Sequence, residues 1–375
     1  MAKNNFNPFL LTGYESPEFF CDRKEETQEL LESLRNGRNV TLTSPRMMGK
    51  TGLILHTFRI LKEKNPGVAT IYMDLFPTES LQDLIRMFAS EVLGSIDSNP
   101  MKVLKQAASV IRGIRPNITI DGITGKTKIG IDIVQGQEEY TLAQIFDYLK
   151  QTSKECCIAF DEFQQIARYP EKNVEAVLRT YIQNIHNVHF IFSGSQSHLL
   201  TEMFLSPKRP FYQSTSNKNI GPIDRGNYYT FAASFFSKQG RLLPPEVFDT
   251  IYKQYDGHTW YIQKIMNQLY GNPDGVIDEK AVNEAVLQIL QENAFYYQML
   301  MRSYTKGQVR LMKAVACEGV VKELTAGRFI AKYDLTAASS VKSASRHLLE
   351  NEILYRSKKG YLVYDRFFGL WLQRL

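Results

Sequence analysis

The chain has 375 residues, of which 43% are hydrophobic and 22% charged, and its formal net charge is +6. This is an ordinary globular balance with room for two or three domains, and so mild a charge does not identify a partner. No apolar run reaches the roughly 18 residues of a membrane span, and the N-terminus has too short an apolar stretch for a secretory signal. Four cysteines without CxxC spacing favour a reduced, cytoplasmic compartment.

The segment from Thr41 to Phe58 begins like a strand, ends like a helix and carries a near match to the phosphate-binding loop G-x-x-x-x-G-K-[ST]. Serine replaces the first glycine, and a small serine can serve at the start of the loop. Gly49 lets the backbone approach a phosphate, Lys50 can reach the β- and γ-phosphates, and Thr51 can bind magnesium. The alternative is a basic strand-to-helix turn. The residues expected to hold ATP are Ser44, Pro45, Arg46, Met47, Met48, Gly49, Lys50, Thr51 and Gly52.

A nucleotide site of this kind also needs a carboxylate at the end of a second buried strand. The apolar run from Cys156 to Phe160 is followed by Asp161 and Glu162, about 110 residues beyond the lysine. We expect Asp161 to orient Mg²⁺ and Glu162 to polarise the attacking water. A solvated strand end is the alternative, but the two motifs together are far more specific than either alone.

Further apolar strands, 67–76 and 187–196, alternate with amphipathic helices, which predicts a three-layer α/β fold with a parallel sheet. Ligands of such sheets lie at the carboxyl ends of the strands, so Ser193 or Ser195 is expected beside the γ-phosphate, or simply in a turn. Alternating isoleucines and glycines over 115–137 predict an inserted β-hairpin.

These motifs, with Phe20–Glu26, "SPKRPFYQS" and the ending "YLVYDRFFGLWLQRL", resemble the archaeal-type ATPases, which belong to the STAND branch of the AAA+ P-loop NTPases. The resemblance covers nearly the whole chain. It implies that Phe20 and Arg23 line the adenine pocket, that Arg209 is an arginine finger or sensor, and that His258 approaches the nucleotide from a helical lid. Arg209 taken alone is a basic residue before a proline, and Thr259 replaces the family's proline.

The expected domains are a P-loop ATPase core at 1–230, a helical lid at 231–304 and a winged-helix domain at 305–375. The last segment has a helix–helix–helix–wing pattern. The candidate DNA-facing residues are Ser340, Lys342, Ser343, Ser345 and Arg346 on the third helix and Arg356, Lys358 and Lys359 in the wing. The alternative is a module that packs against its own ATPase, a protein partner or another copy.

The sequence therefore supports two hypotheses. In the first, the protein is a slow, Mg²⁺-dependent ATPase that acts as a nucleotide-dependent switch, and ATP binding moves the lid and the winged helix. In the second, it is a regulator that binds double-stranded DNA through Lys342, Arg346, Lys358 and Lys359, and nucleotide mainly stabilises the fold. The two hypotheses differ in whether the function of the protein requires hydrolysis of ATP through Glu162. Neither needs a membrane.

Overall fold

The computed structural model describes residues 6–96, 114–120, 127–134, 136–273, 275–357 and 359–375. The chain divides into two compact units. One contains residues 12–228 and 258–260, and the other contains the described N-terminal residues 6–11 together with 229–257 and the described residues from 261 to 375. Within the described ranges, no helix combines the length and the apolar character that crossing a membrane requires.

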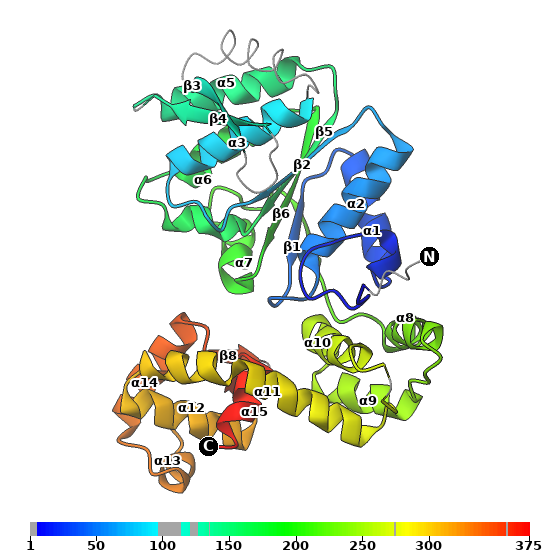
Figure 1. Cartoon of the computed structure of the whole chain (residues 1–375). Helices are drawn as coiled ribbons and strands as arrows, with labels where there is room; N and C mark the ends of the chain where they lie inside the picture. Colours follow the sequence, from blue (N-terminus) through cyan, green and yellow to red (C-terminus); the bar gives the residue numbers. More distant parts are fainter. Residues whose placement is uncertain (1–5, 97–113, 121–126, 135, 274, 358) are drawn as a thin grey trace. The chain divides into compact units, whose positions relative to one another are not determined.

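The first unit is built on five parallel strands in the order β2–β5–β6–β1–β7 (Figure 1). The strands are β1 (Val40–Thr43), β2 (Ala69–Asp74), β5 (Cys156–Asp161), β6 (Val188–Gly194) and β7 (Ser216–Asn219). Every residue of β5 is buried, as expected of a central parallel strand covered on both faces. The predicted parallel α/β sheet is confirmed, and β6 separates the strand of the phosphate loop from the strand of the carboxylates.

Helices cover both faces of this sheet (Figure 1). On one face α1 and α2 pack through a cluster that includes Leu30, Leu53 and Phe58. On the other, α3, α5 and α6 pack through a larger cluster around Phe146 and Phe190. The helices are α1 (Lys24–Arg35), α2 (Lys50–Lys64), α3 (Leu81–Ile96), α5 (Glu138–Gln151), α6 (Val174–Ile182) and α7 (Ser197–Leu205), with short 3-10 turns η1 (Pro17–Phe19) and η2 (Phe163–Arg168).

A two-stranded hairpin lies in the segment where the sequence predicted an insertion, 115–137. Strands β3 (Ile114–Ile120) and β4 (Thr127–Ile133) pair antiparallel as a separate two-stranded sheet. The centre of the predicted segment, residues 121–126, lies outside the described residues.

Most of the next four helices belong to the second unit, in the segment where the sequence predicted a helical lid, and we call them the lid helices. They are α8 (Arg225–Lys238), α9 (Pro245–Gln254), α10 (Thr259–Tyr270) and α11 (Glu279–Arg302). The described N-terminal segment packs here, because the buried Phe9 ring lies against Phe231, Phe236 and Tyr270. Residues 6–11 therefore belong with the lid rather than with the sheet, although the sequence placed them in an ATPase core at 1–230.

The C-terminal part of this unit has the order of a winged helix. Its elements are α12 (Lys306–Glu318), α13 (Gly327–Lys332), α14 (Ala338–Glu350), β8 (Leu354–Ser357), β9 (Gly360–Val363) and α15 (Arg366–Leu372). Strands β8 and β9 form the two-stranded wing. The predicted winged-helix domain is confirmed. Ser345 was expected to face outward, and this expectation is wrong: its side chain is buried and its hydroxyl donates to the carbonyl of Lys342 at 3.0 Å.

Asp365 starts α15, whose aromatic side chains close the core of this unit. Its carboxylate accepts hydrogen bonds from the backbone N–H groups of Phe367 at 2.9 Å and Phe368 at 3.2 Å. These are donors that no helical carbonyl can satisfy, so the carboxylate is an N-cap.

We therefore expect Asp365→Ala to lower the free energy of unfolding by about 0.5–2 kcal/mol, as loss of an N-cap does. Asp365→Asn should keep most of it, because the amide oxygen still accepts. Urea denaturation of the full chain, followed by tryptophan fluorescence, checks this. Asp147→Ala is the control, since that side chain is exposed on α5. Equal losses for Asp365→Ala and Asp147→Ala would contradict the N-cap role.

Candidate nucleotide-binding site

The loop between β1 and α2 ends in an open helix N-terminus. Gly49 precedes α2 with φ 91°, a left-handed conformation that favours glycine, and no side chain caps the helix. The first N–H groups of this 15-residue helix are thus available to an anion. Lys50, Thr51 and Gly52 form the first turn, Met48 is buried and Met47 is exposed.

Ser44 has a defined role at the position of the missing glycine. Its side chain is fully buried, and its hydroxyl accepts from the Lys50 ammonium at 3.0 Å and donates to the Pro45 carbonyl at 2.9 Å. The ammonium also donates to the carbonyls of Ser44 and Pro45, each at 3.4 Å. Burial lowers the pKa of Lys50, whereas the carboxylates of Asp161 and Glu162 raise it. The loop holds its lysine folded inward, where a bound phosphate can take over the contacts.

Asp161 joins the two motifs. Its Oδ2 accepts from the Thr51 hydroxyl at 2.6 Å and from the Tyr72 hydroxyl at 2.8 Å, and its Oδ1 accepts from the Ser193 hydroxyl at 2.5 Å and from the Glu162 N–H at 3.0 Å. The residue is 4% exposed. The hydroxyl and the carboxylate expected to hold Mg²⁺ are therefore in direct contact, although 110 residues separate them. Ser193 thus supports this carboxylate, and its expected place beside the γ-phosphate stays a prediction.

Glu162 lies on the other side of the strand end and contacts the loop after β6. Its carboxylate accepts from the Ser195 hydroxyl at 2.8 Å and from the Gln164 amide at 2.5 Å. The Arg46 guanidinium donates to the same Ser195 hydroxyl at 3.2 Å. Residues of the phosphate loop, the carboxylate strand and the next strand thus form one polar network.

These residues fit MgATP. The open helix N-terminus and Lys50 suit a polyphosphate, and the adjacent oxygens of Thr51 and Asp161 are the hard ligands that Mg²⁺ prefers. Asp74, opposite Asp161 on β2, adds a carboxylate at the same edge, and burial raises its pKa.

An aromatic group borders the first turn of α2. The Phe20 ring lies within 3.4 Å of the position that a Cβ on Gly52 would occupy, and it stacks on His56 with ring centroids 4.3 Å apart. The Tyr14 hydroxyl is 2.9 Å from Nδ1 of His56. A flat apolar surface beside a phosphate loop suits a purine base.

Arg23 is buried and contacts other protein groups, and its expected place in the adenine pocket stays a prediction. Its guanidinium pairs with Glu26 at 2.7 Å and donates to the carbonyl of Met48 at 3.2 Å. The Gly49 N–H belongs to the same peptide unit as that carbonyl and points the opposite way, because peptides are trans and planar. Arg23 therefore fixes the backbone of the phosphate loop.

Two further residues taken from the resemblance also belong to the first unit. The Arg209 guanidinium pairs with Glu175 on α6 and lies 3.7 Å from Glu202 on α7. His258 follows α9 and belongs, with residues 259–260, to the compact unit of the sheet. Neither position tests the catalytic or nucleotide-contacting role expected of it.

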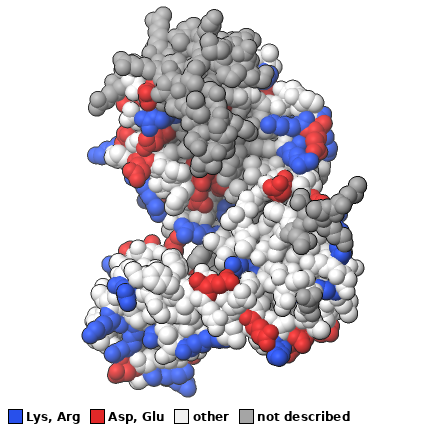
Figure 2. Space-filling model, viewed as in Figure 1, with Lys and Arg blue, Asp and Glu red and all other residues white. Residues whose placement is uncertain are grey.

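The candidate DNA surface lies on the winged helix, where Lys and Arg side chains gather (Figure 2). Residues 305–375 hold 13 Lys and Arg against 6 Asp and Glu, so this module carries +7, more than the +6 of the whole chain. Lys342 and Arg346 are exposed on α14, one turn apart. Among the described residues, no carboxylate pairs with either. Lys358 lies outside the described residues.

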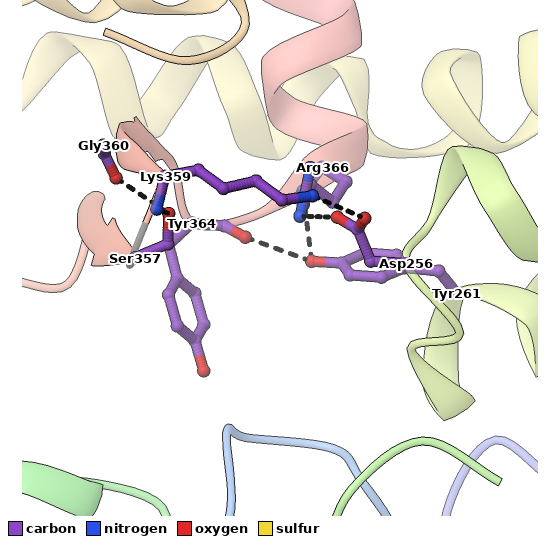
Figure 3. A network of polar contacts seen from close by, with 7 residues as sticks. All are labelled: Asp256, Tyr261, Ser357, Lys359, Gly360, Tyr364 and Arg366. Atoms are coloured by element: carbon purple, nitrogen blue, oxygen red, sulfur yellow. Dashed lines mark hydrogen bonds and ion pairs between the residues drawn. The ribbon is translucent and has the colours of Figure 1, made fainter. Parts of the chain in front are cut away.

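A polar network joins the lid to the winged helix (Figure 3). Asp256, between α9 and α10, accepts from the Arg366 guanidinium at 2.8 Å and lies 3.6 Å from the Lys359 ammonium of the wing. The Tyr261 hydroxyl accepts from the Arg366 N–H at 3.0 Å and donates to the Tyr364 carbonyl at 3.3 Å. Beneath this network the Phe367 ring packs against Tyr255 and Tyr261.

Comparison with protein families agrees with this architecture. A family described as an ATPase domain predominantly from Archaea matches residues 20–265, more than half of the chain, and a probable winged helix domain matches residues 295–374. The chain therefore belongs to this archaeal-type ATPase family, with a winged helix at its C-terminal end. The family match supports nucleotide binding and ATPase activity. A comparison with curated proteins found no match.

Solved structures show the same fold. A Walker-type ATPase of Pyrococcus abyssi is similar at a TM-score of 0.64 and 17% identity, covering 98% of this chain and 100% of that chain. The ORC2 protein of Aeropyrum pernix, in ADPNP–ADP complexes, gives 0.62 and 14%, covering 98% of each chain. The ORC1 protein of Aeropyrum pernix, in complex with DNA, gives 0.55 and 13%, covering 98% of this chain and 96% of that one. At these identities the likeness concerns the fold alone.

Sequence reasoning missed several side chains of the site. Tyr72 donates to Asp161, Gln164 contacts Glu162, and His56 stacks on Phe20. The contact of Gln164 was predictable from the sequence, since this residue follows Glu162 by two positions. Tyr72 and His56 carried no signal, because each reaches the site through the packing of another element.

Proposed function

We propose that the protein binds MgATP at the carboxyl edge of its sheet and hydrolyses it slowly, as a nucleotide-dependent switch of the STAND type. The observation that carries this proposal is the contact between Thr51 and Asp161 at 2.6 Å, because it unites the phosphate loop with the carboxylate strand. Bound Mg²⁺ would neutralise charge on the phosphates. Lys50 and the α2 N-terminus would hold the β- and γ-phosphates, Thr51 and Asp161 would hold the metal, and Glu162 would accept a proton from the attacking water.

Slow turnover is supported by the present contact of Arg209. This residue, the candidate arginine finger, is bonded to Glu175 on α6. Arg209 would have to leave Glu175 to reach a nucleotide, in its own chain or in another copy. A correctly placed arginine finger is worth roughly 10³–10⁵ in rate, so a chain with Arg209 so engaged hydrolyses ATP slowly.

The lid–wing network supports a switch. Asp256 bonds to the winged helix through Arg366 and stands two residues before His258, the residue that the family resemblance directs to the nucleotide. The ion pair is partly exposed and worth only about 0–1 kcal/mol, whereas the buried contacts of Phe367 hold the two parts more firmly. A movement of the 255–258 segment would therefore be passed to the winged helix.

The second candidate function, a regulator that binds double-stranded DNA, is favoured by the charge of the winged helix. Lys342 and Arg346 share one face of α14, and Lys359 lies between the two strands of the wing that follows this helix. The likeness in fold to the ORC1 protein, whose structure contains DNA, is in keeping with this. In the resting arrangement Asp256 lies 3.6 Å from Lys359, so release of that contact would free a cation for phosphate.

For ATP hydrolysis, we expect Glu162→Gln to keep ATP affinity and to lose about 10²–10⁴-fold in turnover, because the isosteric amide cannot accept the proton. Lys50→Ala should lose affinity itself. Labelled ATP is titrated and its hydrolysis followed, with Lys64→Ala, at the exposed end of the same helix, as the control. An absence of ATP binding by wild type, or equal turnover in Glu162→Gln, would refute the proposal.

For DNA, we expect the full chain to bind duplex with an affinity that falls as salt rises, by about 0.9 log units of affinity per log unit of salt for each phosphate contact. Changing both Lys342 and Arg346 to Ala should flatten this slope by about two units. The control is the same loss of charge at Lys62 and Lys64. The switch predicts that affinity also differs between ATP- and ADP-loaded protein, whereas a purely structural nucleotide predicts equal affinities. An unchanged slope in the double variant would place any DNA contact elsewhere.

A further inference from the structure

The carboxylate of Glu162 is anchored through one of its two oxygens. Oε2 lies 2.5 Å from the Gln164 amide nitrogen, 2.8 Å from the Ser195 hydroxyl and 3.4 Å from the Ser195 N–H. Among the described residues, no donor reaches Oε1. A carboxylate oxygen offers about two lone-pair directions, so Oε2 has no capacity left for a water. The oxygen available to accept a proton is Oε1.

Gln164 is built into this position. Its side chain is 5% exposed, and it stands in η2 directly after the carboxylate strand. Its own Oε1 is buried and has no hydrogen-bond partner among the described residues. A buried unpaired carbonyl oxygen is costly, so the amide orientation that leaves it unpaired needs a compensating contact. That contact is the donation to Glu162, because the reversed amide would set an oxygen against the carboxylate.

Gly194 makes the room for Gln164. A Cβ placed on Gly194 would lie 1.9 Å from Oε1 of Gln164 and 3.0 Å from its Cδ. Gly194 is the last residue of β6, where its backbone is compatible with any side chain. The glycine is therefore required by the close approach of the glutamine and not by the conformation of the chain. The obstructed atoms are the far end of a flexible side chain, so an alanine here would displace the amide and spare the sheet.

We propose that Gln164, seated over Gly194, is a positioning residue for ATP hydrolysis: it holds Oε2 of Glu162 so that Oε1 faces the attacking water. Gln164 itself touches neither nucleotide nor water in this scheme. The inference rests on the proposed ATPase function and identifies what orients the base of that same site.

The test is single-turnover hydrolysis of ATP bound to excess full-length protein, with ATP affinity measured separately. Gln164→Ala and Gly194→Ala should each lower the hydrolysis rate about 10–100-fold, the cost of a misplaced catalytic group, and leave ATP affinity unchanged. The double variant should be no slower than the slower single variant, because both changes remove the same contact. Gln164→Glu should also be slow, since it sets a second carboxylate against Glu162.

The matched control is Gln165→Ala. The side-chain amide of this neighbour donates to the carbonyl of Thr78 at 3.0 Å and makes no hydrogen bond to the Glu162 carboxylate. The backbone N–H of Gln165 bonds to the Glu162 carbonyl, and the alanine keeps that bond, so the rate should be unchanged. Melting temperatures of all variants separate misfolding from misplacement. A variant that melts early is replaced by Gln164→Met, which keeps about the same side-chain length and has no N–H to donate to Glu162.

Wild-type rates in both Gln164→Ala and Gly194→Ala, while Glu162→Gln is inactive, would overturn the inference and leave the ATPase standing. Losses that multiply in the double variant would also overturn it, because the two residues would then act separately. A wild type that binds ATP but does not hydrolyse it would overturn the proposed function first and the inference with it.

Discussion

The hydrogen bond from Thr51 to Asp161 is the contact on which the rest of the site depends. It links the first turn of α2 to the end of β5, across the intervening strand β6. A buried carboxylate is costly unless donors surround it, and Asp161 has four, from Thr51, Tyr72, Ser193 and the Glu162 N–H. Those donors come from elements distant in the sequence. The strand order β2–β5–β6–β1 brings these donors together, and they offset the cost of burying the Asp161 carboxylate.

The need of a buried carboxylate for hydrogen-bond donors also explains why Asp161 and Glu162 have different serine partners. Ser193 points to Asp161, and Ser195, two residues on, points to Glu162. The end of β6 and the residue that follows it thus support both carboxylates: Asp161, proposed to hold the metal, and Glu162, proposed to accept the proton of the water. Arg46 donates to Ser195 from the phosphate loop, so an anion that attracts Arg46 would also disturb the support of Glu162. In the proposed mechanism, nucleotide binding would thus affect the position of the Glu162 carboxylate through Arg46 and Ser195.

Much of this was open to prediction from the sequence. The buried run before Asp161 and the loop before Lys50 predicted strands, and parallel strands bring their carboxyl ends to one edge. The partners of those residues were not predictable: Tyr72 reaches Asp161 only because β2 pairs with β5, a fact of strand order that no local pattern encodes. The burial of Ser345 was predictable from the local sequence, because Val341, Ser345 and Leu348 follow the i, i+4, i+7 spacing of a buried helix face. A small polar residue on that face was taken for a surface residue.

The positive charge of the chain is concentrated in the winged helix, outside the candidate nucleotide site. The winged helix carries more positive charge than the whole chain, so the rest is close to neutral. A nearly neutral ATPase unit joined to a cationic module is suited to controlling an interaction with a polyanion. Within this module, Arg366 and Lys359 already pair with a carboxylate of the lid, that of Asp256.

The central claim is that the two motifs form one MgATP site, and magnesium linkage tests it most directly. ATP affinity of the full chain is measured with Mg²⁺ and with EDTA, for wild type, for Asp161→Asn and for Asp147→Asn, an exposed control on α5. The account predicts that Mg²⁺ strengthens ATP binding in wild type and control, and that Asp161→Asn loses this gain while still binding ATP without the metal. The same Mg²⁺-dependent gain in Asp161→Asn as in wild type would contradict it.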